Sequence, residues 1–387
     1  MVRVLHILTS LDRGGIETFL MNVYRHIDRT QIQFDFVIST HRECHYTKEV
    51  LALGGQIYDI PTRREGIIKR WEALNAIFDT HSEYKIVHYH VSSLTDIMPL
   101  QIAKRKNIPV RIVHSHNTSQ GGSFIHRYIH RINKLFIKRY ATDFYACSDL
   151  AAKWMYNRRQ YEKRDFVIIN NGIDLKCFHF NPVVRLRLRK EFGFDDKQLV
   201  IGNVGRFHIQ KNHIFLLEIF VEILKIRSDA YLCLVGDGEL RNQIEKRIHE
   251  LNIAEHVILT GVRNDIPQIL SMFDVLLMPS LYEGLPVSII EAQATGLPCI
   301  LSSAITSEVK ILDTLIFKSF TDSKEDWCNA VIHAANTMRP LHIETLIADA
   351  GYDIMSITHF LEEQYLLKYR SSEIYYLKHY LGNPSYI

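Results

Sequence analysis

Short apolar runs rich in β-branched residues alternate with amphipathic stretches along the whole chain of 387 residues. Strand–helix alternation of this kind favours parallel sheets with helices on both faces. Continuously apolar runs such as Val275–Met278 fit strands that are covered on both sides. The expected strands are 2–8, 34–39, 56–60, 86–89, 111–114, 143–146, 166–169, 199–204, 231–235, 257–259, 275–278 and 298–301.

The number of expected strands predicts more than one domain, because a single open sheet of that size would be unusual. The segment 174–198 is polar, contains Pro182 and precedes a new strand–glycine–helix unit, so we expect the junction there. The sequence therefore predicts an α/β protein with two doubly wound, Rossmann-like domains, 1–175 and 198–353, that face each other across a cleft. A helical C-terminal segment, 354–387, is expected to cross back to the first domain.

The composition indicates the cellular compartment of the protein rather than its activity. The six cysteines are scattered without a C-x-x-C pair, which favours buried thiols in a reducing compartment. The apolar run at the N-terminus has the length of one strand and is too short for a signal peptide. No run approaches the roughly 18 apolar residues that a membrane-spanning helix needs. We therefore expect a cytoplasmic protein.

The segment 283–292, with the sequence EGLPVSIIEA, is the strongest candidate for a binding site. Gly284 lets backbone N–H groups approach a ligand closely, and Pro286 suits the first turn of a helix, whose N-terminus attracts phosphate. Glu283 and Glu291 then lie within about 12 Å of each other and can hold hydroxyl groups on either side of a diphosphate. A nucleotide-sugar fits this pattern, but a helix cap and an ordinary polar position explain the two glutamates equally well.

Two further loops are candidates for anion sites. Arg206 and Lys211 lie in one loop between a strand that ends at Gly205 and the next helix. Two cations there can neutralise the charge that develops on a departing diphosphate, although two surface cations are the alternative. Gly14 and Gly15 open a helix after the first strand, without the full dinucleotide fingerprint.

Two expected strand ends carry histidines at alternate positions, HYH at 88–90 and HSH at 114–116. Because residues i and i+2 share one face of a strand, a metal site has to be considered. No carboxylate or cysteine stands nearby in the sequence to complete a ligand set. We expect a polar cleft edge instead, at which His116 hydrogen-bonds a substrate hydroxyl, with structural histidines as the alternative.

Taken together, these motifs resemble those of the retaining glycosyltransferases of family 4, which have the two-domain GT-B architecture. The resemblance runs from about residue 2 to residue 370 and is greatest to members of capsular and exopolysaccharide biosynthesis. One departure is the turn 302–308, which lacks the glycines of many relatives and leaves the identity of the donor open. The matching elements are the Gly-Gly loop, VHYH at 87–90, HSH at 114–116, IINNGID at 168–174 with Phe178, VGR at 204–206 with Lys211 and Asn212, VGDG at 235–238, Gly261-Val262, the glutamates 283 and 291, and GYD at 351–353.

The resemblance implies roles around the reacting centre. Arg206 and Lys211 are expected to hold the donor diphosphate, with the backbone of Gly15 on its other side. His116 is expected to contact the donor sugar at the reacting centre. The family transfers with retention and needs neither a metal nor another cofactor, and the leaving phosphate helps to deprotonate the acceptor.

The resemblance also implies how the rest of the donor is held. Glu283 is expected to bind hydroxyl groups of the donor sugar, while Gly284 and Leu285 offer backbone N–H groups. Glu291 is expected to bind the ribose, and Val262 is expected to lie beside the base.

Residues 126–140 have a helical pattern in which Arg127, Arg131, Lys134 and Lys138 form a basic stripe. Alone, this pattern favours a solvated basic face; our hypothesis is that the stripe rests on anionic lipid at the inner face of the cell membrane. Nucleic acid is not expected as a partner, because no recognition motif accompanies the charge. The apolar residues expected to face inward are Ile129, Ile132, Phe136 and Tyr140.

These observations and the resemblance predict a retaining, metal-independent hexosyltransferase of cell-surface polysaccharide synthesis. Its donor is expected to be a nucleotide-diphosphate sugar, with a UDP-sugar favoured, and its acceptor a glycan or a polyprenyl-diphosphate-linked saccharide. Two alternatives stay open: a nucleotide-sugar epimerase of the same fold, and a non-catalytic, two-lobed sugar-binding protein. The epimerase needs no acceptor, and a binder of this kind is normally exported.

Overall fold

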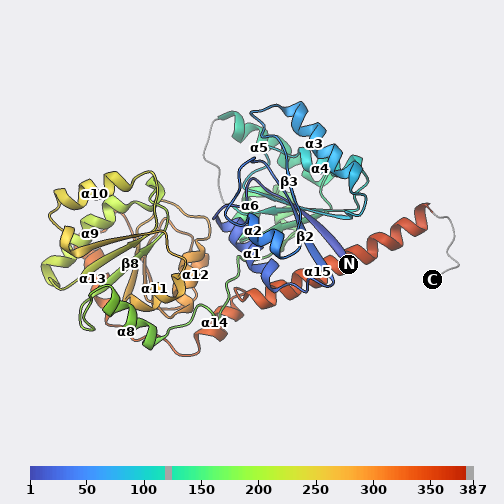
Figure 1. The fold of residues 1–387 in the computed structure, drawn as a ribbon. Coiled ribbons are helices and arrows are strands. Elements are labelled where there is room, and N and C mark those ends of the chain that lie inside the picture. Colours follow the sequence, from blue (N-terminus) through green and yellow to red (C-terminus); the bar gives the residue numbers. More distant parts are fainter. Residues whose placement is uncertain (118–123, 381–387) are drawn as a thin grey trace. The chain divides into compact units, whose positions relative to one another are not determined.

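The computed structural model describes residues 1–117 and 124–380, which form two compact units (Figure 1). The first unit comprises Met1–Gly172 and the C-terminal segment from Ile354, and the second comprises Ile173–Asp353. The long helix α15 (Ile354–Tyr380), red in Figure 1, belongs to the first unit. Residues 381–387 of the expected C-terminal segment lie outside the described residues.

The first unit is built on a parallel sheet of seven strands. The strands are β1 (Val2–Ile7), β2 (Ile32–Ile38), β3 (Ile57–Asp59), β4 (Ile86–Val91), β5 (Val110–Ser115), β6 (Asp143–Ala146) and β7 (Val167–Ile168). Their order, β3-β2-β1-β4-β5-β6-β7, reverses direction between β1 and β4. In open sheets of this kind ligands bind beyond the carboxyl ends of the strands at such a switch point. The helices, besides α15, are α1 (Gly15–His26), α2 (Thr47–Ala52), α3 (Ile67–Thr80), α4 (Met98–Arg105), α5 (Phe124–Phe136), the 3₁₀ turn η1 (Ile137–Arg139), α6 (Asp149–Met155) and α7 (Arg158–Glu162).

Two apolar layers enclose this sheet, as its continuously apolar strands require. Val4 of β1 packs in one layer with Phe19 of α1 and with Tyr365 of α15. Its neighbour Leu5 points to the opposite layer, where it packs with Leu74 of α3 and with residues of α4 and α6. The C-terminal helix therefore completes the core of the first unit.

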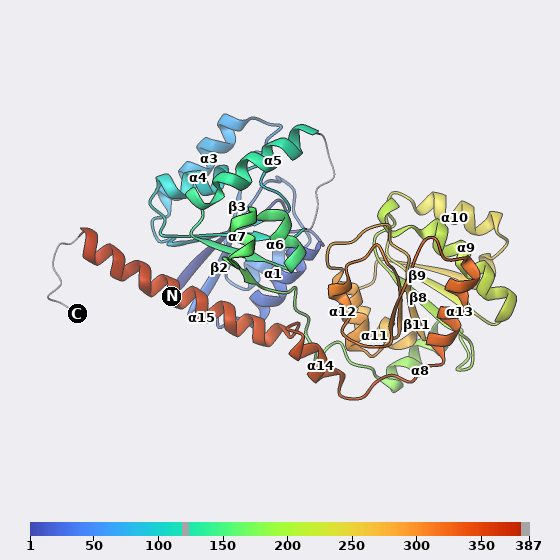
Figure 2. The same ribbon diagram turned by 180° about the vertical axis from the view of Figure 1, so that it is seen from behind.

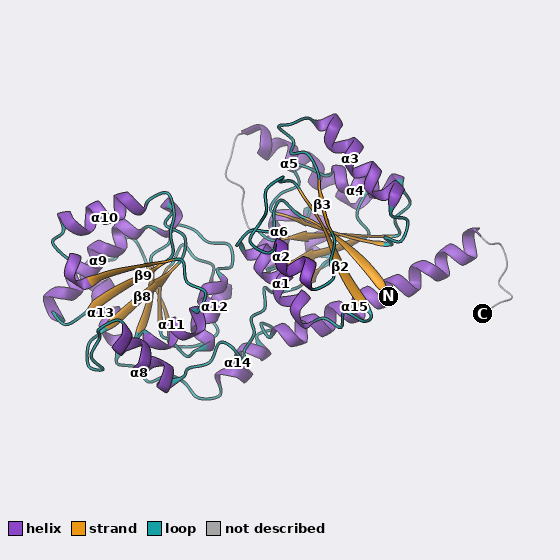
Figure 3. Ribbon diagram, viewed as in Figure 1, coloured by secondary structure: helices purple, strands orange, loops and turns teal. Residues whose placement is uncertain are grey.

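The second unit repeats the plan with a parallel sheet of six strands, drawn in orange in Figure 3. The strands are β8 (Val200–Val204), β9 (Tyr231–Val235), β10 (Val257–Gly261), β11 (Val275–Met278), β12 (Cys299–Ser302) and β13 (Leu315–Lys318). Their order is β10-β9-β8-β11-β12-β13, so the direction reverses between β8 and β11. The helical segments are α8 (Pro182–Glu191), η2 (Ile209–Lys211), α9 (His213–Ile226), α10 (Arg241–Glu250), η3 (Ala254–His256), α11 (Ile266–Met272), α12 (Val287–Ala294), η4 (Ser307–Val309), α13 (Lys324–Ala335) and α14 (Ile343–Asp349).

Helices again cover both faces of this sheet (Figure 2). One layer contains Leu217 of α9 and Trp327 of α13, and the other contains Leu270 of α11 and Ile290 of α12. The α/β class with two doubly wound parallel sheets is thereby confirmed. The cleft between the domains stays a prediction.

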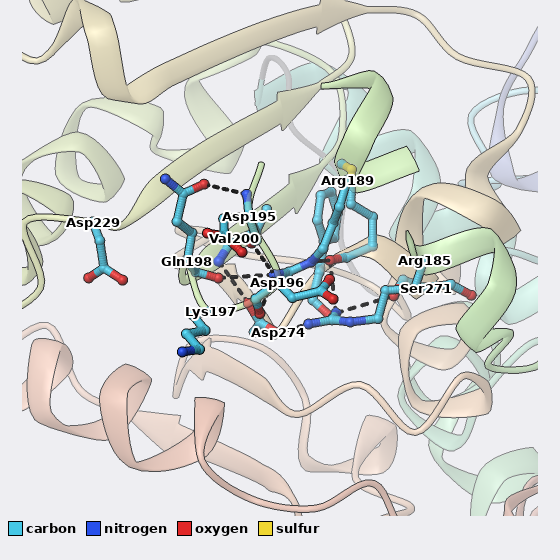
Figure 4. A network of polar contacts seen from close by, with 12 residues as sticks. Arg185, Arg189, Asp195, Asp196, Lys197, Gln198, Val200, Asp229, Ser271 and Asp274 are labelled. Atoms are coloured by element: carbon cyan, nitrogen blue, oxygen red, sulfur yellow. Dashed lines mark hydrogen bonds and ion pairs between the residues drawn. The ribbon is translucent and has the colours of Figure 1, made fainter. Parts of the chain in front are cut away.

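Helix α8, in the segment expected to be a junction, is fixed to the second unit by ion pairs (Figure 4). Arg185 and Arg189 each reach one oxygen of Asp274, just before β11, at 2.6 Å. Arg189 is 1% exposed and also donates to the carbonyl oxygens of Asp195 and Asp196 at 3.0 and 2.9 Å. Because a buried guanidinium is tolerated only when it is paired, these contacts hold α8 in place.

Every expected strand is present, with ends that differ by two residues at most. The strand that the sequence did not predict is β13, a four-residue strand at the edge of the second sheet. Among the described residues, no helix combines the length and the apolar character that crossing a lipid bilayer requires.

Candidate functional site

The loop after β8, which carries both predicted cations, is held by the glycine-rich turn after β9. Gly205 donates its N–H to the carbonyl oxygen of Val235 at 2.9 Å, and Phe207 donates to that of Asp237 at 3.0 Å. Gly236 has a φ of +141°, and a Cβ at this position would lie 2.0 Å from the carbonyl oxygen of Gly205. Gly236 and Gly238 therefore shape the loop that carries Arg206 and Lys211.

Lys211 and Glu283, which the sequence assigned to different parts of a ligand, form an ion pair. Lys211 Nζ lies 2.7 Å from Glu283 Oε1, and the two side chains are only 14% and 8% exposed. Gln210 Nε2 donates to Glu283 Oε2 and to the carbonyl oxygen of Tyr282, both at 2.9 Å. Sequence analysis assigned no role to Gln210, although it adjoins Lys211. A phosphate that binds Lys211 has to share the ammonium group with Glu283.

Arg206 lies in the same loop but is much more accessible. Its side chain is 72% exposed, and its Nη2 lies 3.1 Å from Oε2 of Glu239, whose other oxygen lies 3.4 Å from His208 Nε2. An exposed pair of this kind contributes little stability, so the guanidinium can turn to an incoming anion at low cost. Glu239 was not predicted, although it directly follows the VGDG motif.

Helix α12 offers the N-terminus that the sequence predicted as an anion site. The helix begins at Val287, with Pro286 as its N-cap residue rather than in its first turn, and no side chain caps it. Its first N–H groups and those of the half-buried Gly284 and Leu285 are thus available to a ligand. Within the helix, burial raises the pKa of Glu291 to about 7.

Val262 follows β10 and is 60% exposed. Gly236 donates its N–H to the carbonyl oxygen of Gly261 at 3.0 Å, which joins this loop to the glycine-rich turn. Seven predicted residues thus follow β8, β10 or β11, beyond the carboxyl ends of strands in the second unit. They are Arg206, Lys211, Val262, Glu283, Gly284, Leu285 and Glu291.

The predicted glycine loop of the first unit is open. Helix α1 begins at Gly15 with Gly14 as its N-cap residue, and no side chain caps it. A Cβ on Gly15 would meet nothing within 4 Å, so the space beside it is free. Glu17 lies in the first turn, where burial and the nearby Asp12 raise the pKa of its carboxyl group.

The two histidine pairs lie beside a fifth histidine, His6 of β1, which sequence analysis did not single out. In the sheet His6 is opposite His88, and His90 is opposite His114. His90 connects to its neighbours through both ring nitrogens: Nδ1 lies 2.9 Å from His116 Nε2, and Nε2 lies 3.0 Å from His6 Nδ1. His116, at one end of this chain of rings, is half-buried.

Burial keeps the five rings neutral by lowering the pKa of each, to about 3 for His6 and His116. A neutral ring has one donor and one acceptor nitrogen. His6 Nε2 and His116 Nδ1, at the two ends of this chain of rings, both lack a hydrogen-bond partner among the described residues. An unpaired N–H is costlier to bury than a lone pair, and His6 is fully buried whereas His116 is half-buried. We therefore assign donation from His6 to His90 and from His90 to His116, which leaves the proton of His116 on Nδ1.

His6 also bears on whether the histidine cluster could bind a metal ion. His6, His88 and His90 form one group, and His90, His114 and His116 form another, in which ring nitrogens lie within 4.8 Å of one another. In the first group, His6 of β1 adds a third possible ligand to His88 and His90; in the second group, His90 of β4 adds one to His114 and His116. Binding an ion there would break ring–ring hydrogen bonds and would bury a dication beside neutral groups, which is costly.

The inward face expected for residues 126–140 is confirmed for Tyr140, which packs against the core, and is wrong for Ile132 and Phe136. Ile132 and Phe136 are 38% and 49% exposed, whereas His130 is buried. The helix is attached to the β4–α4 loop by polar contacts, because Leu94 N–H donates to His130 Nδ1 at 3.0 Å and Asn133 donates to the Leu94 carbonyl oxygen at 2.6 Å. The polar residues His130 and Asn133 therefore face inward on α5, while most of its apolar residues are exposed.

The basic stripe is also only partly free. Lys134 donates to the carbonyl oxygens of Lys153 and Trp154 at 2.8 and 2.7 Å, and Lys138 pairs with Asp165. Arg127 and Arg131 remain exposed. They stand on the same helix as four apolar side chains that are 60–75% exposed: Phe124, Ile125, Tyr128 and Leu135.

Comparison with known proteins decides the family. Residues 13–176 match the family model described as Glycosyltransferase Family 4, and residues 184–324 match Glycosyl transferases group 1. Glycosyltransferase EpsF of Bacillus subtilis is 35% identical over 360 residues, which cover 91% of this chain and 93% of EpsF. The chain belongs to glycosyltransferase family 4. Glycosyl transfer is thereby favoured over the epimerase and the non-catalytic binder.

A further relative agrees with this assignment, and a solved structure shows the fold. The Escherichia coli UDP-Gal:alpha-D-GlcNAc-diphosphoundecaprenol alpha-1,3-galactosyltransferase is 26% identical over 313 residues, which cover 78% of this chain and 79% of that enzyme. The crystal structure of HepE from Anabaena in complex with UDP has a TM-score of 0.75 at 17% identity and covers 94% of this chain and 99% of that chain. The family 4 glycosyltransferase described here therefore has the fold of a GT-B enzyme.

Proposed function

We propose that the protein transfers a hexose from a UDP-sugar to a glycan or a polyprenyl-diphosphate-linked acceptor, with retention and without a metal. The observation that carries the proposal is the Lys211–Glu283 pair, 2.7 Å apart, in which Glu283 precedes the uncapped α12 by a few residues. It offers a cation to a diphosphate and a carboxylate to sugar hydroxyl groups. The named UDP-Gal donor and diphosphoundecaprenol acceptor of the Escherichia coli relative support both substrate classes.

Residues of the second unit contact the diphosphate, the sugar and the nucleoside of the donor. Arg206 and Lys211 bind the diphosphate, and the N–H groups of Gly284 and Leu285 complete its binding. Glu283, freed in part from Lys211 by the phosphate, accepts hydrogen bonds from the sugar. Glu291 accepts bonds from the ribose, and the exposed Val262 packs against the base.

Gly15 and His116 of the first unit act on the same donor. The open N-terminus of α1 at Gly15 supplies N–H groups to the diphosphate. Because burial lowers the pKa of His116 to about 3, the neutral ring acts as a hydrogen-bond donor to the sugar and not as the base. The leaving phosphate oxygen takes the proton of the acceptor hydroxyl while the bond from sugar to phosphate breaks and the new glycosidic bond forms on the same face.

Variants of the pair test the donor site. We expect Lys211→Ala and Glu283→Gln to abolish transfer from UDP-sugars, while Lys246→Ala, which removes an exposed lysine of α10, retains it. Product NMR is expected to show the anomeric configuration of the donor, and EDTA is expected to leave the rate unchanged. Full activity of both pair variants would contradict the assignment.

We also propose that α5 contacts anionic membrane at the inner face of the cell membrane. The apolar residues 124, 125, 128 and 135 enter the lipid boundary while Arg127 and Arg131 face lipid phosphates, each worth about 1 kcal/mol near the surface. We expect sedimentation with phosphatidylglycerol vesicles at low salt. Leu135→Ser should reduce it, and Leu51→Ser, at a comparably exposed leucine of α2, should not. Equal binding of Leu135→Ser and Leu51→Ser to the vesicles would refute the proposed membrane contact of α5.

A further inference from the structure

A second chain of hydrogen-bonded rings lies beside the chain of histidines that ends at His116. Tyr365 Oη of α15 lies 2.7 Å from His88 Nδ1, and His88 Nε2 lies 3.2 Å from His114 Nδ1. All three side chains are buried. The proposed donor site gives this second chain no role, because it places none of the three residues against the donor.

The two chains pack against each other ring by ring. His88 and His90 share one face of β4, and their ring centroids are 4.1 Å apart. The ring centroids of His114, in β5, and His116, just after it, are 4.0 Å apart. The four histidines therefore form one block, hydrogen-bonded between the strands and packed along them. Because interiors this closely packed transmit small displacements, a shift of His88 reaches His116.

Tyr365 connects this histidine block to the C-terminal helix, which is attached to the first unit three residues before and three residues after it. Glu362 Oε1 accepts a hydrogen bond from the N–H of Asp28 at 2.5 Å, and Lys368 pairs with Asp143. Asp28 lies just after α1, and Asp143 begins β6. Figures 1 and 2 show α15 running along the first unit. The phenol group is thereby presented to the sheet at a fixed place.

The hydroxyl group of Tyr365 serves the bond to His88 rather than the packing of the core. The side chain is 1% exposed and lies in the apolar layer, where its ring centroid is 5.9 Å from that of Phe34. A phenylalanine would fill this place without a polar group that has to be paired. The bonds to Tyr365 and to His114 fix the His88 ring at both of its nitrogens. With one of these bonds removed, the ring is free to turn about its Cβ–Cγ bond.

We propose that Tyr365 is a positioning residue for glycosyl transfer: by holding His88 it holds the histidine block, and thereby the ring of His116 at the donor sugar. Tyr365 itself does not touch the substrate. This inference rests on the proposed function and adds to it a residue of the C-terminal helix. Because a displacement of about 1 Å can cost about 10²-fold in rate, a small turn of the histidine block has a measurable effect.

The variant Tyr365→Phe, which removes one oxygen atom, tests the proposal. The rate is measured as UDP release from UDP-glucose, UDP-galactose and UDP-N-acetylglucosamine, and the Kd for UDP is measured by calorimetry. We expect kcat with the preferred donor to fall at least about fivefold while the Kd for UDP stays unchanged.

The matched control is Tyr145→Phe. Tyr145 is as buried as Tyr365, and its ring centroid is 5.6 Å from that of His88. Within residues 1–117 and 124–380, its hydroxyl group has no hydrogen-bond partner. Tyr145→Phe should therefore keep kcat within about twofold of the unmodified chain. Equal losses of kcat in Tyr365→Phe and Tyr145→Phe would overturn the proposal.

A double variant separates positioning from a general loss of structure. His116→Phe keeps a ring in the histidine block and removes the hydrogen bonds of the imidazole. In this background Tyr365→Phe should change kcat by less than about twofold, because the group that it positions is already gone. A further fall as large as that caused by Tyr365→Phe alone would show a structural effect and would overturn the proposal. If Tyr365→Phe does not fold, His88→Phe, which removes the other partner of the bond, takes its place with the same expectations.

The outcomes also separate this inference from the proposed function. If His116→Phe lowers kcat and Tyr365→Phe does not, the inference is overturned while the role of His116 stands. If His116→Phe has the kcat of the unmodified chain, the role of His116 fails, and the inference fails with it. An unmodified chain that releases UDP from none of the three UDP-sugars counts against the transferase function itself.

Discussion

Breaking the Lys211–Glu283 pair from one side should destabilise the protein more than removing both charges. Replacing Lys211 by Met leaves the 8% exposed Glu283 with only the bond from Gln210. Removing one partner of a buried pair costs about 3–5 kcal/mol, and the residual exposure puts the expected loss near the lower figure. At 2–4 °C per kcal/mol for a unit of this size, the melting temperature should fall by about 6–12 °C.

The double variant Lys211→Met/Glu283→Gln measures the coupling directly. Because the second substitution removes the buried charge that the first leaves unpaired, we expect the double variant to regain most of the lost stability, with a coupling energy of about 1.5–3 kcal/mol. Thermal and urea unfolding of the four proteins give the cycle, and all three variants should be inactive in transfer. A coupling energy below about 0.5 kcal/mol would show that Lys211 and Glu283 form only an exposed contact. That result would contradict the donor site proposed around this pair.

Three further predictions concern single positions. Since the pKa of Glu291 is raised to about 7 and ribose hydroxyl groups donate to its ionised form, UDP binding should tighten as pH rises from 6 to 8 with release of a proton, and Glu291→Gln should remove this dependence in calorimetry. His90→Phe breaks the bond to His116 and should lower kcat without changing the Kd for UDP; an equal change in both would contradict the assigned positioning role. Gly236→Ala places a methyl group 2.0 Å from a backbone oxygen at positive φ and should cost at least about 2 kcal/mol of unfolding free energy, whereas Gly15→Ala, which meets nothing within 4 Å, should melt unchanged.

The sequence predicted the fold well because its main signal is local. Continuously apolar runs identified strands such as β11 without reference to their neighbours. Strand β13 was missed because four residues at a sheet edge carry little periodicity. Helix α5 shows a different limit: the 3.6-residue period tells which residues share a face but not which face is buried. Its polar residues His130 and Asn133 face inward because the loop at Leu94 offers them hydrogen-bond partners.

The loops that carry the candidate site residues could be recognised from the sequence, but the contacts between those residues could not. Loops after strands could be recognised from their glycines and charges, and these loops hold the predicted residues. The Lys211–Glu283 pair joins two loops whose approach depends on the pairing of β8 with β11. His6 entered the histidine cluster for the same reason, since it meets His90 across 84 positions of sequence. Such contacts follow from strand order, which the sequence pattern alone does not give.

The most direct test of the account is a crystal structure of the full chain with UDP. We predict that the diphosphate oxygens lie within hydrogen-bond distance of Lys211 Nζ and of the N–H groups of Gly284 and Leu285, with the ribose hydroxyl groups on Glu291. Phosphates bound away from Lys211, with its ion pair to Glu283 undisturbed, would contradict the account.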